Sequence, residues 1–248
     1  MPRFSSSPLY DRASDRFSGL LLVDKPAGPT SHDIVARVRR QFCIEKVGHG
    51  GTLDPNATGL LILLLGRATR LSDRIMGSDK TYVGTLRLGR TTNTQDADGQ
   101  IISEHPYDTI RIEQVKDVIA AMQGDLRQIP PMVSAIKVKG VPLYKLARKG
   151  EEIAREARLV HIYKFQLNSW QPPLVEFEVV CSKGTYIRTL CHDLGMTLGC
   201  GASMENLRRT TSGKFNVNNA IPFDELLKFS REELANHIIP FATAAAIL

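Results

Sequence analysis

The run of six aliphatic residues from Leu60 to Leu65 constrains the fold of this chain more than any other stretch. It is too short for a typical globular helix and has the length of a strand buried on both faces. It follows a glycine-rich turn, GHGGTLDPNATG at residues 48–59, in which Pro55 restricts Asp54 to extended conformations. The sequence therefore predicts a central buried strand with a carboxylate on a stiffened loop beside it.

Asp54 has two interpretations from this local pattern. An aspartate before a proline is commonly a turn residue that bonds to its own backbone. A carboxylate on a loop beside a central strand is also a plausible reactive group. The pattern leaves both open.

The composition indicates a soluble globular protein with a mild preference for polyanions. The 248 residues suffice for one large domain or two small ones, and 32 Lys and Arg against 26 Asp and Glu give a net charge of +6. The four cysteines form no CxxC pair, and there is neither a signal peptide nor an apolar run long enough to span a bilayer. We expect a cytoplasmic protein with reduced thiols and no membrane contact.

Hydrophobic periodicity predicts a mixture of strands and helices along the chain. The further predicted strands are Leu20–Val23, Thr81–Leu88, Leu159–Leu167 and Leu174–Cys181, the last two as an antiparallel pair. The predicted helices begin at Thr30 or Ser31, at Ala68, near Val115 and after a cap at Thr185, with further starts at Pro222 and Ser230. Residues 1–18 are expected to be a mobile tail.

A basic segment follows the middle of the chain. Residues 137–158 carry seven basic and three acidic residues, a net charge of +4, and prolines and glycines interrupt the segment. This composition is typical of a projecting insertion that contacts a phosphate backbone.

Two further side chains have open interpretations. Tyr82, near the start of a predicted strand, fits half-buried packing as well as catalysis. Arg188 falls in the first turn of a predicted helix, where the macrodipole disfavours a cation by ~0.3–1 kcal/mol. A buried carboxylate or an RNA phosphate would offset that cost, and an arginine that reaches water is the alternative. The TQDADG segment at residues 94–99 is interpreted as an acidic turn, not a calcium loop.

Several common enzyme motifs do not occur in the sequence. There is no P-loop, complete dinucleotide fingerprint, G-x-S-x-G or H-E-x-x-H, and the six histidines form no metal-binding pattern. A carboxylate enzyme without metal or cofactor, or a pure RNA-binding protein, remains.

Four motifs together resemble the tRNA pseudouridine synthase B family, which modifies uridine 55 in the T loop of tRNA. They are GHGGTLDPNATG (48–59), KTYVGTLRLG (80–89), CSKGTYIRTLCHDLG (181–195) and LGCGASMENLRR (198–209). The resemblance extends from Gly19 to Ile221 and keeps the family's motif order. It implies an α+β fold, the pseudouridine synthase fold, with a central mixed and largely antiparallel sheet flanked by helices and a basic insertion loop.

The resemblance also implies catalytic roles for three residues. Asp54 matches the family's catalytic aspartate, and Arg188 matches the arginine that pairs with it and keeps it ionised. Tyr82 matches the tyrosine that stacks on the target base and is a candidate for proton transfer at the sugar. The reaction is an isomerisation, so no cofactor is expected.

Other positions match substrate contacts. The substrate-binding residues implied by the resemblance are His49, Tyr186, Leu207 and Lys183. Residues 128–151, here called the insertion, correspond to the family's mobile loop that grips the T arm of tRNA. We expect one catalytic domain over residues 19–248, acting as a monomer.

The chain departs from the family pattern in two places. Position 50 is glycine where threonine is common, and the chain stops where most relatives continue into a small C-terminal RNA-binding domain. The alternative function, from another class, is a catalytically idle tRNA-binding module or tRNA-folding chaperone.

Overall fold

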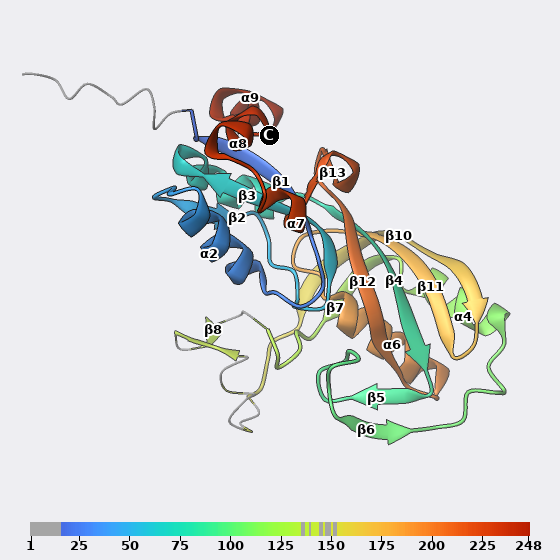
Figure 1. Cartoon of the computed structure of the whole chain (residues 1–248). Coiled ribbons are helices and arrows are strands. Elements are labelled where there is room, and N and C mark those ends of the chain that lie inside the picture. Colours follow the sequence, from blue (N-terminus) through green and yellow to red (C-terminus); the bar gives the residue numbers. More distant parts are fainter. Residues whose placement is uncertain (1–15, 135–136, 139, 144–145, 147–149, 151–152) are drawn as a thin grey trace, which may run out of the picture. The chain divides into compact units, whose positions relative to one another are not determined.

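The computed structural model describes residues 16–134, 137–138, 140–143, 146, 150 and 153–248 (Figure 1). They form two compact units. Unit 1 combines the residues up to Met76 with Lys214–Leu248, and unit 2 is the intervening segment Gly77–Gly213. Unit 1 is therefore built from two segments that lie far apart in the sequence.

Unit 1 contains a small sheet in which parallel and antiparallel pairs are mixed. The strands that pair within it are β1 (Gly19–Lys25), β2 (Val47–His49), β3 (Thr58–Leu65), β14 (Ile221–Pro222) and β15 (Ile239–Pro240), and β13 (Phe215–Asn216) also lies in unit 1. Strand β3 pairs antiparallel with both β1 and β2. The other edge of β1 pairs with β14 in parallel and with β15 antiparallel.

Short helices surround this sheet. They are α2 (Ser31–Gln41), η1 (Gly66–Leu71), α3 (Ser72–Met76), η2 (Val217–Asn219), α7 (Phe223–Leu226), α8 (Arg231–Asn236) and α9 (Phe241–Ile247). Thr30 caps α2 and Ser230 caps α8, each in a capping box. The single helix expected from Ala68 is wrong. A 3₁₀ turn precedes a separate helix there, beginning at Gly66, whose φ of +57° favours glycine.

The aliphatic run forms the core of unit 1, as predicted. Every residue from Leu60 to Leu65 is at most 1% exposed. Alternate residues of β1 and β3 face a cluster completed by the 3₁₀ turn, α3 and α9. Burying a leucine contributes about 1.5–3 kcal/mol, so this run fixes β3 as the centre of the unit.

Unit 2 contains a five-stranded antiparallel sheet in the order β12, β4, β11, β10, β7. These strands are β4 (Lys80–Leu88), β7 (Gly124–Gln128), β10 (Arg158–Gln171), β11 (Leu174–Cys181) and β12 (Ala202–Ser212). Two small hairpins accompany it, β5 (Arg90–Thr92) with β6 (Ile101–Glu104), and β8 (Lys137–Val138) with β9 (Val141–Pro142).

Two helices pack on this sheet, α4 (Ile112–Ala121) against β10 and α6 (Ile187–Leu198) against β12 (Figure 1). The apolar residues beneath them include Phe165 and Phe177, whose rings meet edge to face at 5.7 Å. This face of the sheet is therefore the core of unit 2.

The fold class is α+β, as the resemblance implied, and the predicted strands are confirmed. Strand β10 runs four residues beyond the predicted Leu167. Register shifts between Ile162 and Lys164 and between Leu167 and Ser169 interrupt the alternation. A bulge changes which residues face the core, so a simple period of two loses the end of this strand.

Candidate active site

One buried lysine holds the backbone of the loop that carries Asp54. Lys25, the last residue of β1, is fully buried, and its ammonium donates hydrogen bonds to three carbonyl oxygens. The acceptors are Pro26 at 2.8 Å, Pro55 at 2.7 Å and Ala57 at 2.8 Å. Two of these residues lie within three positions of Asp54, so Lys25 fixes the path of the chain immediately after the carboxylate.

Lys25 also places a positive charge close to Asp54. Burial lowers the pKa of the Lys25 ammonium to about 8, and attraction to the Asp54 carboxylate opposes that shift. At neutral pH the ammonium is therefore still largely protonated, and within unit 1 it supplies Asp54 with a counter-charge.

The start of α2 holds the other side of the same loop. The Ser31 hydroxyl donates to the carbonyl of Leu53 at 3.0 Å and accepts from the Leu53 N–H at 2.8 Å. The Gly28 N–H donates to the carbonyl of Pro55 at 3.0 Å. Backbone groups on both sides of Asp54 are thus bonded to fixed elements, which preorganises the position of the carboxylate.

His49 ends β2, five residues before Asp54, and accepts a hydrogen bond on Nδ1 from the Gly51 N–H at 3.4 Å. Gly50 is buried between them. A Cβ there would lie 2.3 Å from Cγ2 of Ile75, so Ile75 occupies the space that a side chain at position 50 would need. The glycine at this position is therefore matched to a bulky neighbour on α3.

Tyr82 and Leu207 lie on adjacent strands of unit 2. Tyr82 on β4 is 9% exposed, and Leu207 on β12 is 7% exposed. Leu207 is directly opposite Gly84, two residues beyond Tyr82 on the same strand, so both side chains lie on the same face. A Cβ at Gly84 would meet Cδ1 of Leu207 at 3.1 Å, which shows that the leucine extends over the glycine.

Helix α6 carries Tyr186 and Arg188 at its start. Its N-cap is Tyr186, with no side-chain cap, so the prediction that Thr185 caps this helix is wrong. The Thr185 hydroxyl instead donates to the carbonyl of Ser182 at 2.9 Å, within the preceding turn. Arg188 therefore lies in the first turn, as expected.

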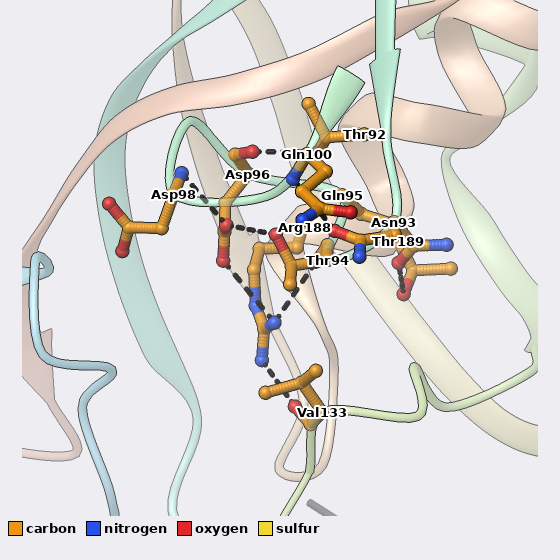
Figure 2. A network of polar contacts seen from close by, with 10 residues as sticks. All are labelled: Thr92, Asn93, Thr94, Gln95, Asp96, Asp98, Gln100, Val133, Arg188 and Thr189. Atoms are coloured by element: carbon orange, nitrogen blue, oxygen red, sulfur yellow. Dashed lines mark hydrogen bonds and ion pairs between the residues drawn. The ribbon is translucent and has the colours of Figure 1, made fainter. Parts of the chain in front are cut away.

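Arg188 is only 4% exposed, and its guanidinium contacts polar groups of unit 2 (Figure 2). It forms an ion pair with Asp96 at 3.3 Å and donates to the carbonyls of Thr94 at 3.1 Å and Val133 at 2.9 Å. The buried-carboxylate interpretation of Arg188 is thus the one observed, because the Asp96 charge offsets the helix dipole.

Hydrogen bonds to the Asp96 carboxylate order the acidic turn at residues 94–99 (Figure 2). The carboxylate of Asp96 accepts from the Thr94 hydroxyl at 2.5 Å and from the Asp98 N–H at 3.2 Å. Gln95 adopts a φ of +66°, and its side chain accepts from the Thr189 hydroxyl at 2.8 Å. These bonds aim the Asp96 carboxylate at Arg188.

Lys183 lies exposed in the turn between β11 and α6. It stands close to a buried lysine, Lys80 at the start of β4. Burial is the main cause that lowers the pKa of Lys80 to about 8, and the positive charges of Arg209 and Lys183 add to it. This end of the sheet therefore concentrates positive charge near Tyr82, which follows Lys80 on the strand.

Family models match most of the chain. One described as "TruB family pseudouridylate synthase (N terminal domain)" matches residues 39–187. This chain belongs to the TruB family. A second model, "tRNA pseudouridylate synthase B C-terminal domain", matches residues 188–246, so the two models meet within helix α6 of unit 2.

Curated TruB relatives share close to half of its residues. The tRNA pseudouridine synthase B of Opitutus terrae is 48% identical over 227 residues, which are 92% of this chain and 94% of that protein. The enzyme of the same name from Syntrophotalea carbinolica is 47% identical over 92% of this chain and 74% of its own length.

Solved structures share the pseudouridine synthase fold with this TruB chain. One is described as "Crystal Structure of a Cbf5-Nop10-Gar1 Complex", with 28% identity, a TM-score of 0.74 and coverage of 98% of this chain and 68% of that one. Another is an H/ACA RNP bound to a substrate RNA containing 2'-deoxyuridine, with 26% identity, a TM-score of 0.70 and the same coverage.

The residues that the TruB resemblance assigned to the site divide between the two units. His49 and Asp54 lie in unit 1, whereas the other five lie in unit 2. Those five are Tyr82, Lys183, Tyr186, Arg188 and Leu207. The pairing of Asp54 with Arg188 joins the two units, so it stays a prediction.

Most of the insertion's charge lies outside the described residues. Of the five basic residues in the insertion, Lys139, Lys145, Arg148 and Lys149 are not described. The first residue of the insertion, Gln128, ends β7 and is 1% exposed. The insertion's role in gripping the T arm stays a prediction.

Sequence reasoning overlooked two residues that hold candidate site residues in place. It assigns no role to Lys25, and it interprets Asp96 only as part of an acidic turn. A lysine between an apolar strand and a proline, and an acidic turn that follows a strand directly, were the available signals. Neither signal identifies the residue that is held. Asp54 lies 29 residues from Lys25 along the chain, and Arg188 lies 92 residues from Asp96.

Within the part of the chain that the structure describes, no group of three or more His, Cys, Asp or Glu side chains could hold a metal ion. None of the described helices combines the length and hydrophobicity needed to cross a membrane.

Proposed function

We propose that this chain isomerises uridine 55 in the T loop of tRNA to pseudouridine, with Asp54 as the nucleophile. Membership of the TruB family and the names of its relatives support the reaction class. The observation that carries the assignment of the nucleophile is the Asp54 loop, whose backbone is bonded to Lys25 and Ser31 on either side of the carboxylate. A turn that served only local structure would not need two buried polar side chains to hold it.

The chemistry requires the target uridine to leave the folded T loop. Extruding a base costs stacking energy, and an aromatic surface such as Tyr82 returns part of it. Asp54 then acts as the nucleophile in a covalent or ion-pair route. The C1′–N1 bond breaks, the uracil rotates and C5 bonds to C1′. The C5 proton then leaves, and N1 takes up a proton in its place. The product is an isomer of the substrate, so the atoms balance without a co-reactant.

The remaining site residues support this reaction in unit 2. Arg188, held by Asp96 and two carbonyls, is proposed to pair with Asp54 when the site is complete. Tyr186 and Leu207 are proposed to line the pocket for the base, His49 to enter the T loop, and Lys183 to bind the RNA backbone as a flexible point charge.

The proposed working form is a monomer in the cytoplasm that binds the T arm of tRNA. The four cysteines are free thiols, which fits a reducing compartment.

A pseudouridine-mapping assay on unmodified tRNA transcript tests the proposal. Wild-type protein is expected to form pseudouridine at position 55, whereas Asp54→Asn is expected to bind the transcript without forming product. The aspartate-to-asparagine change keeps the side-chain volume, and circular dichroism checks that the variant is folded.

The alternative function is a catalytically idle tRNA-binding module or folding chaperone. It predicts tight binding without product from the wild-type protein. Product from Asp54→Asn at the wild-type rate would reject Asp54 as the nucleophile while leaving the reaction class intact.

A further inference from the structure

The N-cap residue of helix α6 provides no side-chain hydrogen bond to the first turn of the helix. Its N-cap, Tyr186, has extended φ and ψ of −97° and 107° and no side-chain cap. The helix start nevertheless carries two side chains of the proposed site, Tyr186 and Arg188. Something outside the helix must set the direction in which they leave the backbone.

The side chain of Gln128, at the end of β7, bonds the backbone of Tyr186. Its amide nitrogen donates to the carbonyl of Tyr186 at 2.9 Å, and its amide oxygen accepts from the N–H of Tyr186 at 2.7 Å. Both backbone polar groups of one residue are therefore bonded by one side chain, much as a neighbouring strand would bond them. This pair of bonds fixes the rotation of the Tyr186 backbone as well as its position.

Gln128 is rigid enough to serve as a fixed support. It is 1% exposed, it is the last residue of β7, and it pairs with Arg158 at the start of β10. A buried amide with both of its polar ends satisfied in one geometry has few alternative rotamers. The position of Tyr186 is thus tied to the sheet of unit 2.

The segment that begins at Gln128 meets the same helix start a second time. Five residues further along, the carbonyl of Val133 accepts from Nη2 of Arg188 at 2.9 Å (Figure 2). Gln128 and Val133 both belong to the first part of the insertion. The base of the insertion and the first turn of α6 therefore form one hydrogen-bonded assembly.

We propose that Gln128 is a positioning residue for the reaction: its carboxamide sets the backbone of Tyr186 and, through it, the placement of Tyr186 in the base pocket and of Arg188 for its proposed pairing with Asp54. This inference rests on the proposed function of the site. It also gives the insertion a direct connection to the pocket, so that RNA bound by the insertion and the base-binding residues share one support.

The test compares Gln128→Met with Gln123→Met. Methionine matches glutamine in length and offers no amide. Gln123 lies in the same unit, and its side chain also accepts from a backbone N–H, that of Phe165 at 3.2 Å, away from α6. Single-turnover pseudouridine formation at saturating enzyme is measured at a temperature where circular dichroism shows all proteins folded.

Gln128→Met is expected to lower the single-turnover rate about 10–100-fold, the range for a small misplacement of a site residue. Its affinity for a T-arm hairpin is expected to change much less. Gln123→Met is expected to keep the wild-type rate. A rate for Gln128→Met within about twofold of the wild type would overturn the proposal.

The pH dependence of the Gln128→Glu rate distinguishes a positioning role from a purely structural one. The carboxylate form accepts from the Tyr186 N–H but has no hydrogen for the Tyr186 carbonyl, whereas the protonated acid offers both. The rate of Gln128→Glu relative to wild type is therefore expected to rise as the pH falls from about 8 to about 5.5. The ratio for Gln128→Met should stay flat, and a flat ratio for both variants would reject the positioning role.

Hydrogen exchange of the amides from Tyr186 to Leu190 tests the inference separately from the proposed function. Gln128→Met is expected to speed exchange there by about 10-fold or more relative to Gln123→Met, because the Tyr186 amide loses its acceptor. Unchanged protection would overturn the inference even if the wild-type protein formed no pseudouridine. A wild type without product but with this exchange pattern would instead reject only the proposed function.

Discussion

Replacing Lys25 by methionine tests whether a buried ammonium holds the Asp54 loop. The pKa of Lys25 falls from an ordinary 10.5 to about 8 because burial disfavours its charge. At 1.36 kcal/mol per pH unit, this difference means that keeping the ammonium charged in the folded state costs about 3 kcal/mol. The three carbonyls that it bonds would each lose about 1–3 kcal/mol without a donor.

At neutral pH these two contributions oppose each other, so the pH dependence of the free energy of unfolding is the decisive quantity. The cost of the charge is present in full below about pH 8 and is relieved as the pH rises from 8 to 10.5, because only the unfolded state still binds the proton there. Between pH 7 and 10 the folded wild type should gain roughly 2–3 kcal/mol relative to Lys25→Met.

Urea unfolding followed by circular dichroism at several pH values measures this difference. Subtracting the free energies of unfolding of Lys25→Met from those of the wild type cancels the other titrating groups. Lys46→Met, which removes an exposed lysine of the same unit, controls for the loss of one charge. A difference that stays constant or shrinks between pH 7 and 10 would refute the reasoning, since it would mean that the folded state does not penalise the ammonium.

Two other substitutions follow from the site geometry. Asp96→Asn is expected to destabilise the protein by about 3 kcal/mol and to slow turnover, because Arg188 keeps its buried charge without a carboxylate. Thermal unfolding measures the stability and single-turnover assays measure the rate, and wild-type values for both would contradict this prediction. Gly50→Ala is expected to cost about 1–3 kcal/mol through its clash with Ile75. Adding Ile75→Ala should remove that clash, so strictly additive effects in a double-mutant cycle would disprove the contact.

The sequence predicted the fold correctly wherever an element depends only on its own residues. The aliphatic run predicted β3 because every residue in it is buried, and the capping boxes at Thr30 and Ser230 marked helix starts because the bonds are local. Strand β10 was predicted too short because its bulges depend on the pairing with β11. The start of α6 was placed one residue early because the backbone of its N-cap, Tyr186, is bonded by Gln128, 58 residues away, and no local side chain caps the helix.

The site was predictable in its residue types but not in its connections. A carboxylate on a turn and an arginine at a helix start could both be recognised, and the family resemblance gave them roles. Lys25, Asp96 and Gln128 could not be recognised, because each acts through bonds to backbone or side-chain groups far along the chain. Such bonds leave no period in a sequence, so only the folded arrangement reveals them.

The two-segment construction of unit 1 has a consequence for how the protein is made. The edge of β1 next to Lys25 is completed by β14, where Val23 pairs with Ile221 and Asp24 with Pro222. The ribosome therefore releases β1 and the Asp54 loop about 160 residues before it releases the strand that completes their sheet. During synthesis unit 2 can fold first, whereas the sheet beside the Asp54 loop is completed only near the end of translation.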